Sequence, residues 1–177
     1  MLNVIFHLIC YYVVWFTCIL SASHGYYWLG FITSVFFTTI QYVIQMKANQ
    51  SRHLLMLIGC LTAVGFSIDS LFAKCDLLAF KANPFHSNLS PPWMIALWIN
   101  FSIILYACLK KYFLKYKLLA LLSLFGFPLA YYAGVSLGAA SLPNGYIGLV
   151  FIGITWSIAL PTILYLYEKL LWSKNDN

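Results

Sequence analysis

The residue with the most evident chemistry is an aspartate inside an apolar run. Asp69 stands in the stretch GFSIDSLF, which otherwise holds only apolar residues, serines and a glycine. Placing a charge inside a membrane-spanning segment is costly, so an ionisable residue there is by default a candidate functional group. The carboxyl group is a candidate for binding a cation, carrying a proton or acting as a general acid or base. The structural alternative is a carboxyl group that is hydrated near the interface, or protonated and hydrogen-bonded to Ser70 or a tyrosine.

Three more polar residues fall at a similar depth in other apolar runs. The helix ends that the charge pattern below predicts to face away from the cytoplasm are called the external ends. At about 1.5 Å per residue, Asp69 lies roughly 6 Å and Asn100 roughly 12 Å from the external ends of their helices. Tyr131 and Ser136 lie in the same external half of another helix. We therefore treat Asp69, Asn100, Tyr131 and Ser136 as a candidate polar cluster, whose lateral proximity depends on how the helices pack.

The spacing of the other reactive residues completes no known catalytic or metal-binding set. The five cysteines form no CxxC pair and no paired Cys/His arrangement, so no zinc site is predicted. Asp69 has no second carboxylate within its span for paired-carboxylate chemistry. Of the four histidines, only His86 is placed to approach Asp69. We expect no metal, no cofactor and no catalytic residue, and the prediction leans against an enzyme.

The elements that position these residues are long and apolar. The chain has 177 residues, of which 63% are hydrophobic and 8% charged, whereas soluble domains carry about 25% charged residues. Six runs approach the roughly 20 residues that span a bilayer as a helix, at about 3–22, 26–45, 54–73, 92–109, 118–138 and 146–166. The sequence therefore predicts an all-α fold, which is a polytopic membrane helical bundle of about six transmembrane helices. Residues 1–177 are predicted to form a single integral membrane domain.

The basic residues between the runs predict the orientation. One set of gaps contains Lys47, Arg52, Lys110, Lys111, Lys115, Lys117, Lys169 and Lys174, and the opposite set contains only Lys74 and Lys81. Because cytoplasmic loops of membrane proteins carry the excess of Lys and Arg, both termini are predicted to be cytoplasmic. The net charge of +6 is thus explained by topology. A nucleic-acid partner is not expected, because such a partner needs clustered basic residues on a folded face.

The first run has a second interpretation as a signal peptide. The letters SAS at 21–23 resemble a cleavage site of small residues. The segment before the run carries no Lys or Arg, however, and the run is longer than the usual 7–15 apolar residues. These two features favour a retained helix.

Prolines and glycines mark the fifth and sixth runs. Pro128 cannot donate to the carbonyl of Leu124, so it is predicted to bend the fifth helix, and Pro161 is predicted to break the sixth near its cytoplasmic end. Ala130, Gly134 and Gly138 recur every four residues. Such a stripe of small residues favours close packing of another helix over a ligand groove.

The start of the fourth run, SPPWMIALWIN, has the residues of a helix beginning. Ser90 is predicted to cap the helix, and Pro91 and Pro92 to begin it where missing backbone donors cost nothing. Trp93 is predicted to anchor the chain at the external membrane interface, and Trp98 to pack deeper in the bundle.

Three stretches together resemble a known family. They are NVIFHLICYYVVWFTCIL, PPWMIALWINFSIIL and FGFPLAYYAGVSLGAASLP, and the resemblance extends from Asn3 to about Tyr165. The chain resembles the small bacterial inner-membrane family known as domain of unknown function 2878, whose pattern also has an aspartate in the third span, here Asp69. The family has no assigned activity. Its members are often encoded near enzymes that modify membrane fatty acids, which implies a role linked to lipids or the envelope.

Three functions follow as hypotheses. The first is a non-enzymatic multi-pass component of the bacterial inner (cytoplasmic) membrane, linked to membrane-lipid modification or a stress response. Its expected partners are the lipid bilayer and other membrane proteins or lipid-modifying enzymes. The second is a small transporter or flippase that uses Asp69, which predicts a water-accessible path to that residue. The third, least favoured, is an intramembrane lipid-modifying enzyme.

Overall fold

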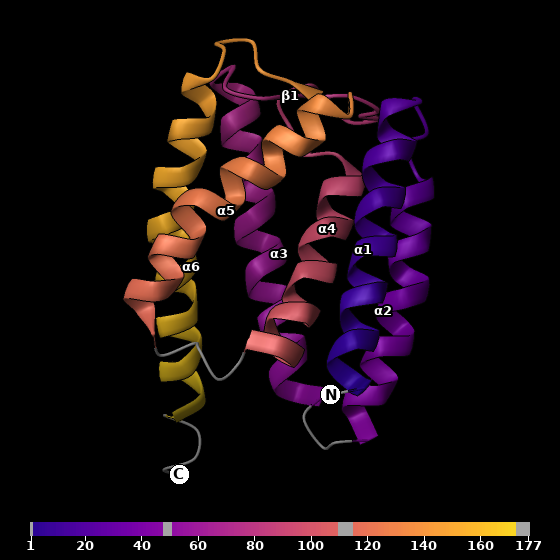
Figure 1. Ribbon diagram of the computed structural model, residues 1–177, viewed down its shortest axis with the longest axis vertical. Helices are drawn as coiled ribbons and strands as arrows, with labels where there is room; N and C mark the ends of the chain where they lie inside the picture. The colour runs from indigo at the N-terminus through magenta and orange to yellow at the C-terminus, as the bar shows by residue number, and fades with distance from the viewer. Residues whose placement is uncertain (1, 48–50, 110–114, 173–177) are drawn as a thin grey trace.

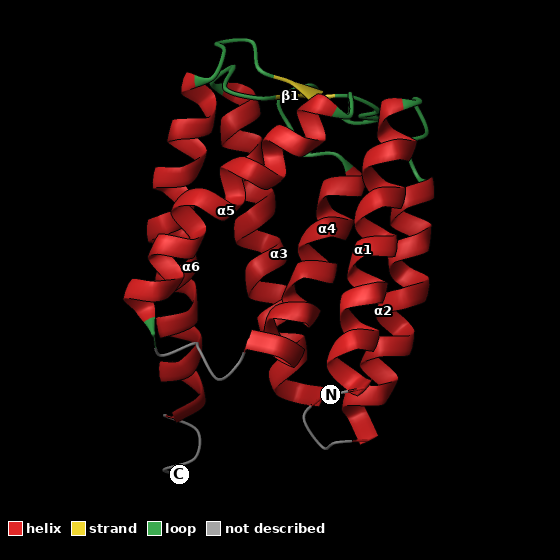
Figure 2. Cartoon of the chain, viewed as in Figure 1, coloured by secondary structure: helices red, strands yellow, loops and turns green. Residues whose placement is uncertain are grey.

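The described part of the chain forms six α-helices, one π-helical turn and one short pair of strands. The computed structural model describes residues 2–47, 51–109 and 115–172. The helices are α1 Leu2–Ser23, α2 Leu29–Lys47, α3 Ser51–Lys74, α4 Pro92–Ile104, α5 Tyr116–Ser136 and α6 Ile147–Trp172, with a π-helical turn, η1, at Leu105–Leu109 after α4. The predicted all-α fold is confirmed (Figure 2). Lys110, Lys111 and Lys174, used above for the orientation, lie outside the described residues.

Four of the helices are long and apolar enough to cross a membrane. These segments are Val4–Ser23, His53–Lys74, Tyr116–Ser136 and Ile147–Lys169. Two further apolar helices, Leu29–Ile44 and Pro92–Ala107, are shorter. Large apolar side chains cover the outside of the bundle, and Ile32, Phe36 and Leu129 are each more than 60% exposed. Water-soluble monomers rarely expose apolar patches larger than a few hundred Å², so this surface is typical of a membrane protein.

The helices pack as two units that meet around α3 (Figure 1). In the first unit, α1, α2 and α4 pack against one another, and α3 packs along α4. In the second, α5 packs along α6, and α6 also contacts α3. Figure 1 shows α5 crossing the bundle obliquely, from beside α6 at its start to the upper end of α1 at its finish. The beginning of α1 and the end of α6 lie at the same end of the bundle.

The opposite end of the bundle is closed by loops and two strands. Strand β1, Ala79–Phe80, pairs antiparallel with β2, Ala140–Ser141. The pairing places Ala79 opposite Ser141 and Phe80 opposite Ala140. The backbone of Lys81 extends it by donating to the carbonyl of Ala139 at 2.9 Å. The α3–α4 connection is therefore tied to the α5–α6 connection, which fixes the upper end of α5 over the first unit.

Two local predictions about helix ends are wrong. Ser90 does not cap α4, because Pro91 occupies the N-cap position without a side-chain hydrogen bond. The amide of Ser90 instead donates to the hydroxyl of Ser70 at 3.0 Å. Pro161 does not break α6, which continues from Ile147 to Trp172 with the proline inside it. Prolines are tolerated within apolar helices when neighbouring groups satisfy the freed backbone.

Pro128 likewise lies inside a continuous α5. The Leu124 carbonyl that it leaves without an intrahelical donor meets Gly153 of α6. A Cβ placed on Gly153 would lie 2.6 Å from that oxygen and 2.9 Å from Cγ of Pro128. Only glycine fits there, so α5 and α6 approach each other with backbone against backbone.

Candidate functional site

Asp69 lies at the point where α3, α4 and α5 meet. The residue is fully buried. The hydroxyl of Tyr131 donates to its Oδ1, and the indole Nε1 of Trp98 donates to its Oδ2 at 2.6 Å. Both carboxylate oxygens thus accept a hydrogen bond, each from a different helix. We call Asp69, Trp98 and Tyr131 the carboxylate cluster.

Trp98 reaches the aspartate because α3 leaves room for its ring. Gly65 lies one turn before Asp69, on the same face of α3. A Cβ at Gly65 would overlap the indole of Trp98. Gly65 and Asp69 therefore form a slot for this ring, in which the glycine provides space and the carboxylate accepts the N–H. The sequence contains this signal as a glycine and an aspartate four residues apart, but only the structure identifies the ring that fills the slot.

A stack of three aromatic rings borders the carboxylate cluster. The rings of Trp98 and Trp156 lie 4.3 Å apart at 28°, and those of Phe127 and Trp156 lie 4.7 Å apart at 20°. Nearly parallel rings at such distances attract one another in addition to burying apolar area. The indole N–H of Trp156 is buried without a hydrogen-bond partner among the described residues. The stack joins α4, α5 and α6 beside Asp69.

The other two predicted members of the polar cluster lie elsewhere. Asn100 is fully buried, but its Nδ2 donates to the backbone carbonyl of Tyr11 in α1 at 3.1 Å. It follows Trp98 by two residues and so lies on a different side of α4. Its Oδ1 is buried without a hydrogen-bond partner among the described residues. Ser136 is exposed near the end of α5. The structure therefore joins Asp69 with Tyr131 and adds Trp98, a residue not assigned to the cluster from sequence.

The predicted stripe of small residues runs along α5 toward α1. A Cβ on Gly134 would lie 3.4 Å from Cδ1 of Ile19, and one on Gly138 would lie 3.7 Å from Cβ of Ser23. Gly138 also has φ +82°, a conformation that favours glycine. Ala130 instead lines the groove described below. A Cβ on Gly153 of α6 would lie closer to α5 than the Cβ of Gly134 or Gly138 would lie to α1, and Gly153 is outside this stripe.

Trp93 differs from its predicted role as an interface anchor. Its side chain is 1% exposed, and its Nε1 donates to the carbonyl of Lys81 at 3.0 Å. The ring also packs edge-on against Phe80, with centroids 5.7 Å apart. Trp93 therefore fastens the loop at the upper end of the bundle from within the protein.

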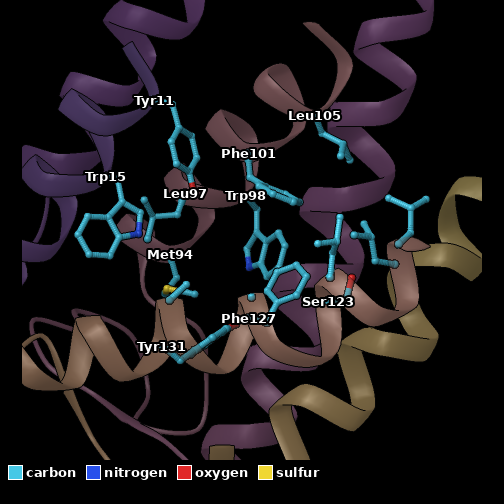
Figure 3. Close-up of a pocket in the computed structure, with 15 residues that line it drawn as sticks. Tyr11, Trp15, Met94, Leu97, Trp98, Phe101, Leu105, Ser123, Phe127 and Tyr131 are labelled. Atoms are coloured by element: carbon cyan, nitrogen blue, oxygen red, sulfur yellow. The ribbon is translucent and has the colours of Figure 1, made fainter. Parts of the chain in front are cut away.

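An apolar groove opens between α1, α4 and α5. It has a volume of about 280 Å³. Figure 3 shows Tyr11 and Trp15 of α1 on one side and Phe127 and Tyr131 of α5 on the other, with side chains of α4 between them. Its lining consists of Tyr11, Trp15, Met94, Leu97, Trp98, Phe101, Leu105, Leu119, Leu122, Ser123, Gly126, Phe127, Ala130, Tyr131 and Leu160. A smaller cavity of about 60 Å³ shares residues with it and continues toward Trp93.

The carboxylate cluster forms one wall of this groove. Trp98 and Tyr131 line the groove, whereas Asp69 lies behind them. Within the described residues, no three His, Cys, Asp or Glu side chains are grouped so as to hold a metal ion. The arrangement is suited to holding α5 against α3 and α4 and to receiving an apolar molecule.

Fold and site together define a helical protein with an apolar exterior, a buried carboxylate cluster and a lateral groove. The sequence model of the family described as "Protein of unknown function (DUF2878)" matches residues 4–162. The chain belongs to this family, as the resemblance predicted. No curated protein and no solved structure matches the chain.

Proposed function

We propose that this chain is a six-span protein of the bacterial inner membrane with both termini in the cytoplasm. Support comes from the apolar outer surface and from the excess of Lys and Arg on one side of the predicted spans. The end of the bundle opposite the termini carries exposed aromatic residues, including Tyr26, Trp28 and Tyr146. Aromatic side chains are enriched where a membrane protein meets the headgroup region.

Within that membrane, the proposed function is to bind a lipid acyl chain without chemical conversion. The observation that carries this proposal is the groove, which is apolar and lies in a bundle whose exterior is also apolar. Ligand pockets usually measure roughly 300–1,000 Å³, and a groove of about 280 Å³ is slightly smaller than the lower limit of this range. One acyl chain fits this description better than a whole lipid does. The proposed partners are bilayer lipids and the membrane enzymes that modify them.

The burial of Asp69 favours this role over that of a transporter or a lipid-modifying enzyme. A transporter that uses Asp69 needs water to reach the carboxylate, and an enzyme needs the carboxylate to face its substrate. Asp69 is fully buried behind Trp98 and Tyr131, and these two residues, not Asp69, line the groove. The carboxylate is thus placed to hold helices together.

Filling the groove tests the proposal. Gly126 lines the groove, and a Cβ there meets nothing within 4 Å. A Cβ at Gly126 therefore meets no neighbour, and Gly126→Phe is expected to place its ring in the groove. Gly59 on the exposed surface of α3 also has open space at its Cβ, so Gly59→Phe is the matched control.

The measurement is the amount of phospholipid that stays bound to the protein purified in detergent, read by native mass spectrometry. We expect the parent protein and Gly59→Phe to retain lipid and Gly126→Phe to lose most of it. Thermal unfolding of all three proteins confirms that the variants are folded. Equal retention by the parent and Gly126→Phe, or no retained lipid in the parent, would contradict the proposed function.

A further inference from the structure

Positive charge lies beyond one end of the groove. The lining residues of α5 recur every three or four positions, from Leu119 to Tyr131. The same line along the helix reaches Lys115 one turn before Leu119. Lys115 and Lys117 both have exposed side chains. The other end of the groove narrows toward the buried ring of Trp93.

We infer that the groove binds one acyl chain of an anionic phospholipid, whose headgroup phosphate lies at the start of α5, against Lys115 and within the positive field of Lys117 on another side of the helix start. This inference rests on the proposed lipid-binding function and adds the class of lipid. It also places the lipid in the leaflet on the side of these lysines, which is the cytoplasmic leaflet in the proposed orientation.

The length of the groove agrees with a single leaflet. Leu119 and Tyr131 are 12 positions apart, or about 18 Å along the axis of α5. The hydrocarbon core of a bilayer is about 30 Å thick, so one leaflet contributes about 15 Å. An acyl chain whose headgroup lies at Lys115 would end near Tyr131, beside the carboxylate cluster.

The charges at this end favour an anionic headgroup. One acidic residue of α6, Glu168, is close enough to the start of α5 to act electrostatically on Tyr116. The next residue, Lys169, is exposed. The three lysines therefore outnumber the one carboxylate in this part of the described structure. A zwitterionic headgroup would bring its own ammonium group to the lysines, whereas an anionic headgroup brings only its phosphate. Each lysine near an anionic membrane surface favours binding by about fivefold.

The experiment compares two headgroups with the same acyl chains. The full-length protein is incorporated into vesicles of equal parts phosphatidylglycerol and phosphatidylcholine, extracted in detergent and analysed for retained lipid by native mass spectrometry. The test variant is the double substitution Lys115→Gln and Lys117→Gln. The matched control is Lys74→Gln with Lys81→Gln, because these two lysines are exposed at the opposite end of the molecule.

We expect the parent protein and the Lys74/Lys81 control to retain phosphatidylglycerol in preference to phosphatidylcholine. In the Lys115/Lys117 variant the ratio of retained phosphatidylglycerol to retained phosphatidylcholine should fall by about fivefold for each lysine. The total amount of retained lipid should persist. A parent protein that retains both lipids equally would overturn the headgroup assignment and leave acyl-chain binding intact. A preference unchanged by the Lys115/Lys117 substitutions would also overturn it. A parent protein that retains no lipid would reject the proposed function, and the inference with it.

Discussion

Removing one hydroxyl from the carboxylate cluster tests whether Asp69 acts as a structural acceptor. In Tyr131→Phe the ring remains but Oδ1 of Asp69 loses its donor, and the fully buried carboxylate keeps only Trp98. Hydrogen bonds to charged groups contribute about 1.5–3 kcal/mol to stability. Bonds between membrane helices average nearer 0.6 kcal/mol, with a maximum of about 1.7. We therefore expect Tyr131→Phe to lower the free energy of unfolding by about 1–2 kcal/mol.

The assay is unfolding in mixed micelles with a rising fraction of dodecyl sulfate. Tryptophan fluorescence includes a signal from the site, because two of the six tryptophans are Trp98, which donates to Asp69, and Trp156, which stacks on Trp98. Tyr132→Phe is the control, since Tyr132 is the next residue on α5, is 44% exposed and lies 6.2 Å from the ring of Tyr146. This control should unfold like the parent protein.

Asp69→Asn separates hydrogen bonding from charge. The asparagine oxygen can accept from Trp98, and its NH₂ can donate to Tyr131, whose hydroxyl rotates to accept. If the role of Asp69 is structural, the free energy of unfolding of Asp69→Asn should fall by less than about 1 kcal/mol. In the double variant with Tyr131→Phe, the two losses of unfolding free energy should not add, because both substitutions affect the same hydrogen bond. The reasoning is refuted if Tyr131→Phe is as stable as Tyr132→Phe. It is also refuted if Asp69→Asn keeps full stability but loses lipid binding.

Three further outcomes follow from close contacts and exposure. Gly65→Ala should destabilise the protein by about 2 kcal/mol or more, because its methyl group overlaps Trp98. In the same unfolding assay, Gly59→Ala should be neutral or stabilising, because its methyl group meets nothing and alanine favours a helix over glycine. Gly153→Ala should separate α5 from α6 and lower the melting temperature, because its Cβ meets backbone. Cys75 is exposed just after α3, so a membrane-impermeant maleimide should label it in spheroplasts. Labelling of Cys75 only after lysis would invert the proposed orientation.

The sequence predicted the helices well because apolar runs of the right length have few other structures available in a membrane. The carboxylate cluster was predicted only in part. Depth along each helix correctly placed Tyr131 in the same layer as Asp69. The same argument also admitted Asn100, since depth does not report on which side of the helix a residue lies. The two residues lie on different sides of α4: Trp98 faces α3, and Asn100 faces α1.

The remaining features depend on contacts between distant segments. The importance of Gly65 and Gly153 depends on a ring and a carbonyl that come from other helices. Trp93 was assigned to the interface because tryptophan is common there, and its burial follows from the loop that folds over it. The groove is lined by α5, which crosses the bundle obliquely (Figure 1), a tilt that no periodicity in the sequence encodes.

The contact of Gly153 with the Leu124 carbonyl has a consequence for biogenesis. In the proposed six-span arrangement, this contact would let α5 and α6 leave the translocon as a paired hairpin, because it lies wholly within these two helices. The segment synthesised earlier supplies Asp69 and Trp98, and the hairpin supplies Tyr131 and Trp156. Lateral docking of the hairpin would then complete the carboxylate cluster and the ring stack in one late step. The groove would be created at that step, so lipid could enter it during assembly and no later opening of the bundle would be required.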